Sequence, residues 1–278
     1  MRPKTRDRGH GPPLGHVLIL WSPMHAAFRP ETVLGRIEHR PYPVPSDPWV
    51  LAMSWRDLLF MHWPVGVEDL RPLVPPALSI DTFEGSAWLG VVPFDMTGVR
   101  PHFLPAVPGL SHFSEINLRT YVTAEGRPGI WFFSLDAHSR VAVRLARATF
   151  HLPYFDAEMY CRASGDEVDY RSLRTHRGAP RAEFAARYGP VGKPFESERG
   201  SIENFLTERY CLYSADRRGN VRRGEIHHHL WPLQPAETEV STLSMTQQIG
   251  LELPETAPIL HFSKRLDALA WLPRKIGS

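Results

Sequence analysis

Residues 111–122, SHFSEINLRTYV, constrain the fold more than any other stretch, because two kinds of side chain alternate along them. Successive side chains on a β-strand point to opposite faces of the sheet. The apolar face of this strand would carry Ile116, Leu118, Thr120 and Val122. The polar face would carry Glu115, Asn117, Arg119 and Tyr121. A carboxylate, an amide, a guanidinium and a phenol in one row either face solvent or line a wet cavity.

Two neighbouring segments favour the cavity. Residues 130–135 are apolar almost throughout, which is typical of a strand covered on both faces. Residues 95–109 contain three prolines, and we expect them to form a long loop that supplies one wall or a lid of a pocket. The outer face of an antiparallel strand stays open as the alternative.

The rest of the chain alternates short apolar runs with turn residues, which predicts many strands and few helices. We expect residues 78–83 and 86–94 to form a hairpin with its turn at Glu84–Gly85. We expect a second turn at residues 127–129. Further strands are expected over residues 55–61, 157–163, 168–173, 182–188, 207–213, 221–231, 239–245 and 258–262. Helices are expected over residues 67–74, 139–150 and 201–206, the second capped by Ser139, with Val141, Leu145 and Ala148 at helical spacing. This pattern favours an α+β, mainly β fold, in which a sheet closes into a barrel with a few external helices, over a parallel α/β fold.

The first part of the chain differs in composition from the rest. Residues 1–52 are rich in Pro, Gly and Arg, and prolines crowd residues 41–48. We expect residues 1–52 to be a flexible or extended N-terminal arm, with Met53 as an alternative start. Residues 53–278 would then form a single domain, which a chain of 278 residues accommodates.

Charge and cysteine content narrow the classes of partner. The net charge of +2 is too small to indicate nucleic-acid binding, and no apolar run approaches the ~18–20 residues that cross a membrane. Cys161 and Cys211 lack metal-ligand spacing and predict free thiols in a reducing cytoplasm. We expect a cytoplasmic protein whose partner is a small-molecule ligand, and self-association into a homo-oligomer stays open.

Several catalytic motifs are absent from the sequence: the glycine-rich phosphate loops, the GxSxG elbow, CxxC pairs and HExxH. No cofactor is therefore expected. His227 and His229 would share one face of a strand, as two metal ligands can. No third ligand stands at a fixed spacing, so we favour ordinary histidines and expect no metal.

Four segments carry a family resemblance: LRPLVPPALSIDTFEGSAWLGVVPFDM, FSEINLRTY, FLTERYCLY and HHHLWPL. Together they resemble the YqjF-like family of uncharacterised proteins, from about residue 55 to residue 273. That family is distantly similar to acetoacetate decarboxylase. The resemblance implies a closed, cone-like antiparallel barrel with external helices and a pocket inside.

The resemblance also implies site residues. It places Arg56 where the decarboxylase has a pocket arginine, and Glu115 where it has one of two pocket glutamates. The other glutamate falls near Gly90 and is missing. Pro153, Tyr154 and Phe155 stand where the decarboxylase has Pro-Lys-Lys, so the Schiff-base lysine is absent. Lys193 lies in a distant segment.

Three hypotheses follow for the function, and whether the protein is an enzyme stays open. In the first, it binds an organic acid or carbonyl compound without Schiff-base chemistry, through Arg56, Arg119, Asn117, Tyr121 and Tyr154. In the second, Glu115 is the catalytic general acid or base of a lyase, isomerase or hydratase. In the third, the barrel is filled and the protein is structural.

Overall fold

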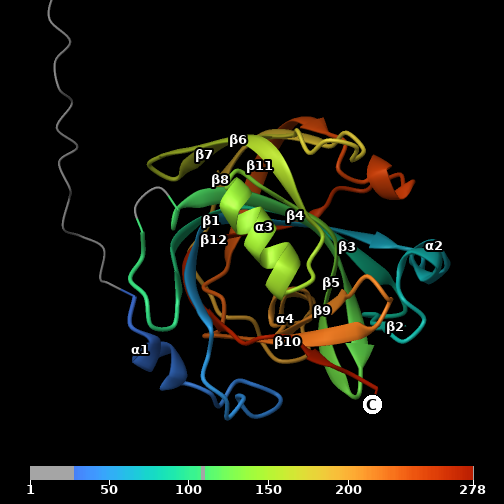
Figure 1. The fold of residues 1–278 in the computed structure, drawn as a ribbon. Helices are drawn as coiled ribbons and strands as arrows, with labels where there is room; N and C mark the ends of the chain where they lie inside the picture. The colour runs from blue at the N-terminus through green and yellow to red at the C-terminus, as the bar shows by residue number, and fades with distance from the viewer. Residues whose placement is uncertain (1–27, 108–109, 278) are drawn as a thin grey trace, which may run out of the picture.

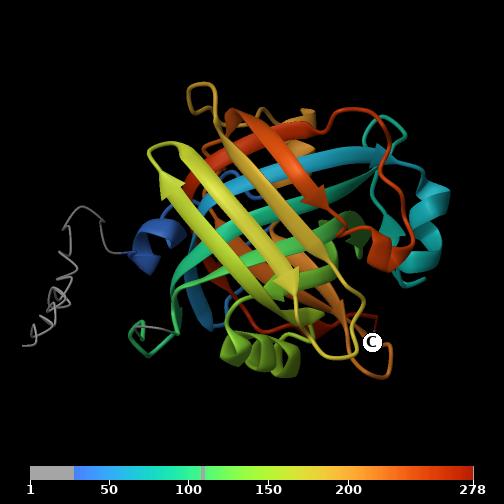
Figure 2. The ribbon, with the colours of Figure 1, turned by 90° about the horizontal axis from the view of Figure 1, so that it is seen from above.

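The computed structural model describes residues 28–107 and 110–277 and shows one large sheet with short helices outside it (Figures 1 and 2). The strands are β1 (Leu51–Val65), β2 (Ser79–Ile80), β3 (Ala87–Pro101), β4 (Phe113–Ala124), β5 (Arg127–Ala137), β6 (Tyr154–Ser164), β7 (Glu167–Arg174), β8 (Glu183–Pro190), β9 (Cys211–Ala215), β10 (Val221–His228), β11 (Gln234–Leu243), β12 (Ile259–Ala270) and β13 (Arg274–Lys275). The helices are α1 (Pro30–Leu34), α2 (Val67–Leu70), α3 (Arg140–Thr149) and α4 (Ile202–Thr207), with 3₁₀ turns η1 (Arg71–Leu73) and η2 (Gln247–Ile249). In these described ranges, no helix has the length and apolarity to span a membrane.

The sheet closes on itself twice. One ring follows the pairings β5-β6-β7-β8-β11-β12-β1-β3-β4 and returns to β5, which makes nine strands. A second ring follows β4-β5-β9-β10-β12-β1-β3 and returns to β4, which makes seven. The two rings share β1, β3, β4, β5 and β12. The expected closed, mainly β fold is confirmed.

Two pairings differ from the antiparallel arrangement that we expected. β5 pairs in parallel with β6 and with β9, whereas the other pairings are antiparallel. A parallel pair needs a crossover connection rather than a tight turn. α3 supplies that crossover between β5 and β6.

Side chains from all nine strands fill the nine-strand ring. Ile116 and Leu118 of β4 meet Tyr170, Phe184 and Tyr188 there, and all five are buried. The shared strands therefore have a second face that points into the seven-strand ring. This is why β4 is buried along almost its whole length although every second residue in its centre is polar.

The hairpin expected around Glu84–Gly85 is only partly right. Both residues have positive φ, +49° and +83°, as a type I′ turn requires. However, only the Phe83–Ser86 bridge joins the two sides, and β2 pairs with β4 instead of β3. β3 also continues to Pro101, so most of the first half of the loop expected over residues 95–109 is strand. The turn expected at residues 127–129 lies at Glu125–Gly126.

The predicted capped helix over residues 139–150 is confirmed by α3. The Ser139 hydroxyl caps its N-terminus by accepting a hydrogen bond from the Ala142 N–H. Its packing face differs from the spacing in the sequence. Val143 is the buried residue, whereas Val141 and Leu145 are 58 % and 56 % exposed. A second apolar stripe of α3 therefore lies open at the surface.

The N-terminal part differs from the expected arm. Val33 and Trp49 are buried against Ala52, Leu269 and Trp271, so residues 28–50 pack on the sheet. β1 also begins before the boundary that we placed at residue 53. The described part of the expected arm, residues 28–52, is therefore packed on the sheet, and residues 1–27 lie outside the described residues.

Candidate ligand-binding pocket

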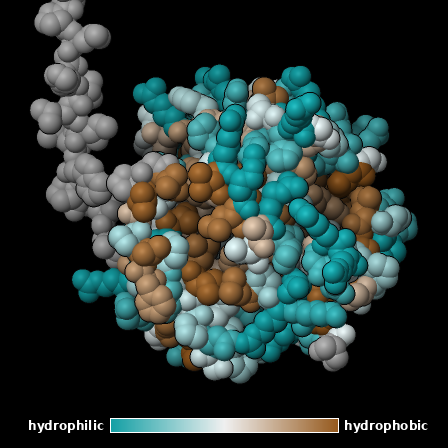
Figure 3. Space-filling model, in the orientation of Figure 1, coloured by the Kyte–Doolittle hydropathy of each residue, from teal (hydrophilic) through white to brown (hydrophobic). Residues whose placement is uncertain are grey.

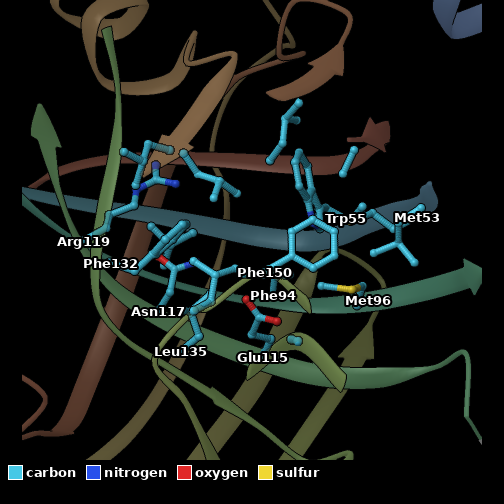
Figure 4. A pocket seen from close by; sticks show the side chains of 18 of the residues that line it. Met53, Trp55, Phe94, Met96, Glu115, Asn117, Arg119, Phe132, Leu135 and Phe150 are labelled. Carbon is cyan, nitrogen blue, oxygen red and sulfur yellow. The ribbon is translucent and has the colours of Figure 1, made fainter. Parts of the chain in front are cut away.

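β4 places three polar side chains along one wall of a pocket inside the seven-strand ring. Glu115, Asn117 and Arg119 occupy alternate positions and all line the pocket (Figure 4). They are only 2 %, 4 % and 7 % exposed. The polar row predicted from the alternation is thus directed into a cavity, for these three of its four members.

The remaining wall is almost entirely apolar. The cavity has a volume of about 190 Å³. All seven strands of the ring contribute to its lining, and α3 covers one side. Its apolar lining includes Met53, Trp55, Leu58, Val92, Phe94, Met96, Phe113, Phe132, Leu135, Phe150 and Trp231.

Glu115 is a buried carboxyl group with one side-chain partner. The Tyr154 hydroxyl donates a hydrogen bond to Glu115 Oε2 at 2.7 Å. Burial raises the pKa of Glu115 to about 8, because a carboxylate loses hydration there, and the Tyr154 bond only partly offsets this. Glu115 is therefore mostly protonated at neutral pH and can donate a hydrogen bond into the pocket.

Tyr154 reaches Glu115 because β6 starts in parallel register with β5. Its partner in that register is Leu135, which also lines the pocket. Tyr154 is the residue that the resemblance placed at the position of the decarboxylase lysine, and its phenol faces the pocket carboxyl group. Among the described residues no lysine lines this pocket: Lys264 pairs with Asp57, and Lys193 and Lys275 are exposed.

Arg119 is a buried cation without a counter-ion. Within residues 28–107 and 110–277, no carboxylate lies within 4.0 Å of its guanidinium. The guanidinium lies over the rings of Phe60 and Tyr121, at 5.2 and 5.8 Å from their centroids. Its Nε and the Oδ1 of Asn117 are buried without hydrogen-bond partners in the described structure. Such groups are costly to bury unless something pairs with them.

Arg56, predicted from the resemblance to be a pocket arginine, does not line the pocket. The β1 side chains that do are Met53, Trp55 and Leu58. Arg56 follows the inward-pointing Trp55 and so falls on the opposite face, between Asp95 and Arg265 of the adjacent strands. The irregular position at Asp57, with φ +47°, then restores an inward direction at Leu58.

Tyr121 is also outside the pocket, although it belongs to the same row. Its hydroxyl donates to the Leu206 carbonyl at 2.8 Å and lies 2.6 Å from His62 Nε2, so the histidine is the donor in the second bond. Tyr121 therefore closes the end of the pocket behind Arg119 by joining β4 to α4 and β1.

Gly90, near which the second glutamate is missing, is opposite Arg119 in the sheet. A Cβ at this position would lie 3.0 and 3.1 Å from the Cδ2 and Nε2 atoms of His62. Burial and the nearby Arg119 hold the pKa of His62 well below its usual value, so the imidazole is neutral. His62 thus occupies the space that a side chain on residue 90 would need.

His228, which the sequence did not indicate as a pocket residue, also lines the pocket. Burial lowers the pKa of His228 to about 3, so this imidazole is neutral too. His227 and His229 point the other way and contact the carbonyls of Val33 and Thr32 in the α1 segment. The alternation that put 227 and 229 on one face could have placed 228 on the pocket side.

The described part of the chain has no cluster of side chains that could bind a metal ion. Nowhere in the described ranges do three His, Cys, Asp or Glu side chains gather closely enough to hold an ion. Arg209 and Thr207 line the inner end of the pocket, and the Arg209 guanidinium is paired with Asp81 at 2.6 Å.

Comparisons with known proteins agree with the fold and add a family. The sequence profile of DUF2071, described as an uncharacterized conserved protein, matches residues 52–267. The uncharacterized protein YqjF of Bacillus subtilis is 47 % identical over 240 residues, which cover 86 % of this chain and 98 % of YqjF.

Solved structures similar to this one share the fold at low sequence identity. MppR, an enduracididine biosynthesis enzyme complexed with the condensation product of pyruvate and imidazole 4-carboxaldehyde, gives a TM-score of 0.58 at 12 % identity, over 82 % of this chain and 90 % of MppR. Acetoacetate decarboxylase from Legionella pneumophila gives 0.55 at 12 % identity, over 86 % of this chain and 93 % of that enzyme. The chain therefore belongs to the YqjF-like DUF2071 family, and its fold is that of the acetoacetate decarboxylase-like proteins.

Proposed function

We propose that this protein binds a small organic acid or carbonyl compound inside the seven-strand ring. The observation that carries the proposal is the Arg119 guanidinium, which is buried in an apolar pocket and has no carboxylate of the described residues beside it. An arginine stays charged under all ordinary conditions, and a carboxylate ligand would supply the missing charge through two parallel hydrogen bonds.

The other two polar groups of β4 fit the same ligand. Asn117 presents a buried amide oxygen without a partner, and protonated Glu115 presents a hydrogen-bond donor. Glu115 and Arg119 are four residues apart, which is about 13 Å between their Cα atoms in a strand. A ligand whose carboxylate meets Arg119 can therefore carry a carbonyl or hydroxyl group that Glu115 recognises.

Similar structures support this class of ligand without naming it. MppR is complexed with pyruvate in one structure, and pyruvate is both an acid and a carbonyl compound. Decarboxylation through a Schiff base is not part of the proposal, because it needs an amine and no described lysine lines the pocket. The open cavity also counts against the alternative of a filled interior.

A second candidate function is catalysis by Glu115 as general acid or base in an isomerase, lyase or hydratase. The observation that favours it is the pKa of about 8, close to the operating pH at which proton transfer is most effective. Tyr154 holds the carboxyl group in a fixed orientation.

Calorimetric titration with pyruvate, acetoacetate and butanoate tests the binding proposal. Arg119→Met should weaken binding of the acids by about tenfold or more, because a charge-assisted hydrogen bond is lost. Arg140→Met is the matched control, since it removes the same charge from an exposed position on α3 outside the pocket. Equal affinities for the wild type and Arg119→Met would refute the proposal.

Turnover separates the two candidates. Each compound is incubated with the wild type and with Glu115→Gln and followed by NMR. An enzyme loses turnover in Glu115→Gln while it still binds the acid, whereas a binding protein leaves every compound unchanged.

A further inference from the structure

The pocket opens to solvent beside α3, and the opening is apolar. Leu51 of β1 and Val99 of β3 line one side of it, and Ala142 and Leu145 of α3 line the other. Figure 3 shows a hollow with hydrophobic surface around it beside α3, in the orientation of Figure 1. Exposed apolar surface beside a pocket often marks a place where a ligand or partner binds. A small polar acid held at the inner end of the pocket would not contact this rim.

Strand register orders the pocket from its inner end to this opening. Arg119 pairs with Gly90, Glu115 with Phe94, and Phe113 with Met96. Val99, three residues beyond Met96, is the next lining residue outward on β3. Figure 4 shows the same order for the labelled side chains. From Arg119 to Phe113 the wall measures six residues, or about 20 Å of strand.

Polar groups are confined to the inner and middle parts of this wall. Three of the described lining residues have a carboxyl or guanidinium group: Glu115, Arg119 and Arg209. Of these, Arg209 is already paired with Asp81. Near the opening the one hydroxyl is that of Thr149, which donates to the Leu145 carbonyl. A further polar group on the described outer wall is the indole N–H of Trp55, a residue opposite Met96 in the register of β1 and β3, and no charged side chain lines that part of the pocket.

α3 is a fixed side of the opening. Arg144 makes two hydrogen bonds to the Asp156 carboxylate, at 2.8 and 2.9 Å, and Arg147 donates to the Tyr154 carbonyl at 2.6 Å. The helix is thus tied to β6 while Leu145 stays 56 % exposed at the rim. An apolar group that leaves the pocket would cover Leu145.

Resting on the proposed function, we infer that the acid carries an unbranched apolar chain, with its carboxylate at Arg119 and the end of its chain at Leu145 in the opening beside α3. The reverse orientation would place the chain against Arg119 and leave the guanidinium without a counter-charge. The proposed ligand class is therefore a medium-chain aliphatic acid, and an oxo or hydroxy group near Glu115 is compatible with it.

The test is a calorimetric series with butanoate, hexanoate, octanoate and decanoate, with octanol as the chain without a carboxylate. Affinity should rise by about fourfold for each added methylene, until the chain passes the opening. Leu145→Glu should weaken decanoate binding by about tenfold while butanoate binds as before, because the chain then meets a carboxylate. Val141→Glu is the matched control: it is equally exposed on the same helix and does not line the pocket.

The outcomes distinguish this inference from the function on which it rests. If the acids bind but all chain lengths bind equally, or if Leu145→Glu and Val141→Glu behave alike, the chain is not in the opening and only this inference falls. If no acid binds, or if octanol binds as tightly as octanoate, the acid site itself is wrong and the proposed function falls with it.

Discussion

At the scale of single residues, two ionisable side chains of β4 are buried in one pocket wall. Burial keeps Glu115 protonated, whereas the Arg119 guanidinium has no counter-ion among the residues that the structure describes. A neutral acid and a free cation on one wall can recognise an acid that also has a neutral polar group. The protonated state of Glu115 could not be predicted from its residue type alone, because it depends on the desolvation of the pocket.

The raised pKa of Glu115 predicts a pH-dependent stability. Its pKa is about 8 in the folded protein and 4.5 as its ordinary value, so the folded state binds the proton more tightly. The contribution of Glu115 to the free energy of unfolding is then fully present below pH 4.5 and is lost as the pH rises to about 8. Glu115→Gln cannot ionise, so its stability relative to the wild type should increase by roughly 1.4 kcal/mol per pH unit across this interval, as an upper bound.

Urea unfolding of both proteins at the two ends of that interval measures this difference. Glu158→Gln serves as control, because it removes a carboxylate from an exposed position on β6. A difference between wild type and Glu115→Gln that does not change with pH would contradict the assignment of a protonated Glu115.

The sequence predicted the pocket residues as far as strand alternation applies. The alternation found Glu115, Asn117 and Arg119, and the resemblance found Tyr154. The resemblance placed Arg56 in the pocket, but Arg56 follows the inward-pointing Trp55 and lies on the opposite face of β1. The alternation also placed Tyr121 in the row, but this side chain extends beyond the inner end of the pocket. The direction in which β1 faces the pocket and the length of the cavity are tertiary properties, and residue order does not contain them.

At the scale of secondary-structure elements, the segment before β1 is held to the sheet by a buried charge. The Arg40 side chain is 1 % exposed and contacts the Glu225 carboxylate at 3.3 Å and the Ile226 carbonyl at 2.6 Å. His39 and His227 add contacts between this segment and β10. Proline-rich composition predicted an arm here, because regular structure is indeed scarce, but composition does not show which charged groups find partners.

Removal of this charge should loosen the segment. We expect Arg40→Met to lower the free energy of unfolding by about 2–3 kcal/mol, since it leaves part of a buried ion-pair network without its partner. Arg36→Met, on an exposed neighbour, should change it by less than about 0.5 kcal/mol. Denaturant unfolding of the two variants checks this, and equal effects would show that Arg40 does not anchor the segment.

At the scale of the whole molecule, one sheet encloses two different interiors. The nine-strand ring is filled by side chains and the seven-strand ring contains the cavity. The sequence predicted a closed, mainly β fold, because many short strands and few helices leave few other arrangements. It could not predict two rings that share five strands, since that follows from long-range pairings such as β10 with β12 and β5 with β9.

The two interiors should respond differently to the loss of a leucine. Leu118 lies in the filled ring and is fully buried, whereas Leu135 borders the cavity. Leu118→Ala should cost about 3–4 kcal/mol of unfolding free energy, and Leu135→Ala at least about 1 kcal/mol less, because fewer packed atoms surround it. Chemical denaturation gives both values. A larger cost at Leu135 would mean that the seven-strand ring is as tightly filled as the other.

The most direct test of the central claim is a crystal structure of the protein grown with octanoate. Electron density for the acid inside the seven-strand ring, with its carboxylate against the Arg119 guanidinium and its chain directed toward Leu145, is the result that we predict. Side chains filling that ring, or a protein carboxylate paired with Arg119, would contradict the claim.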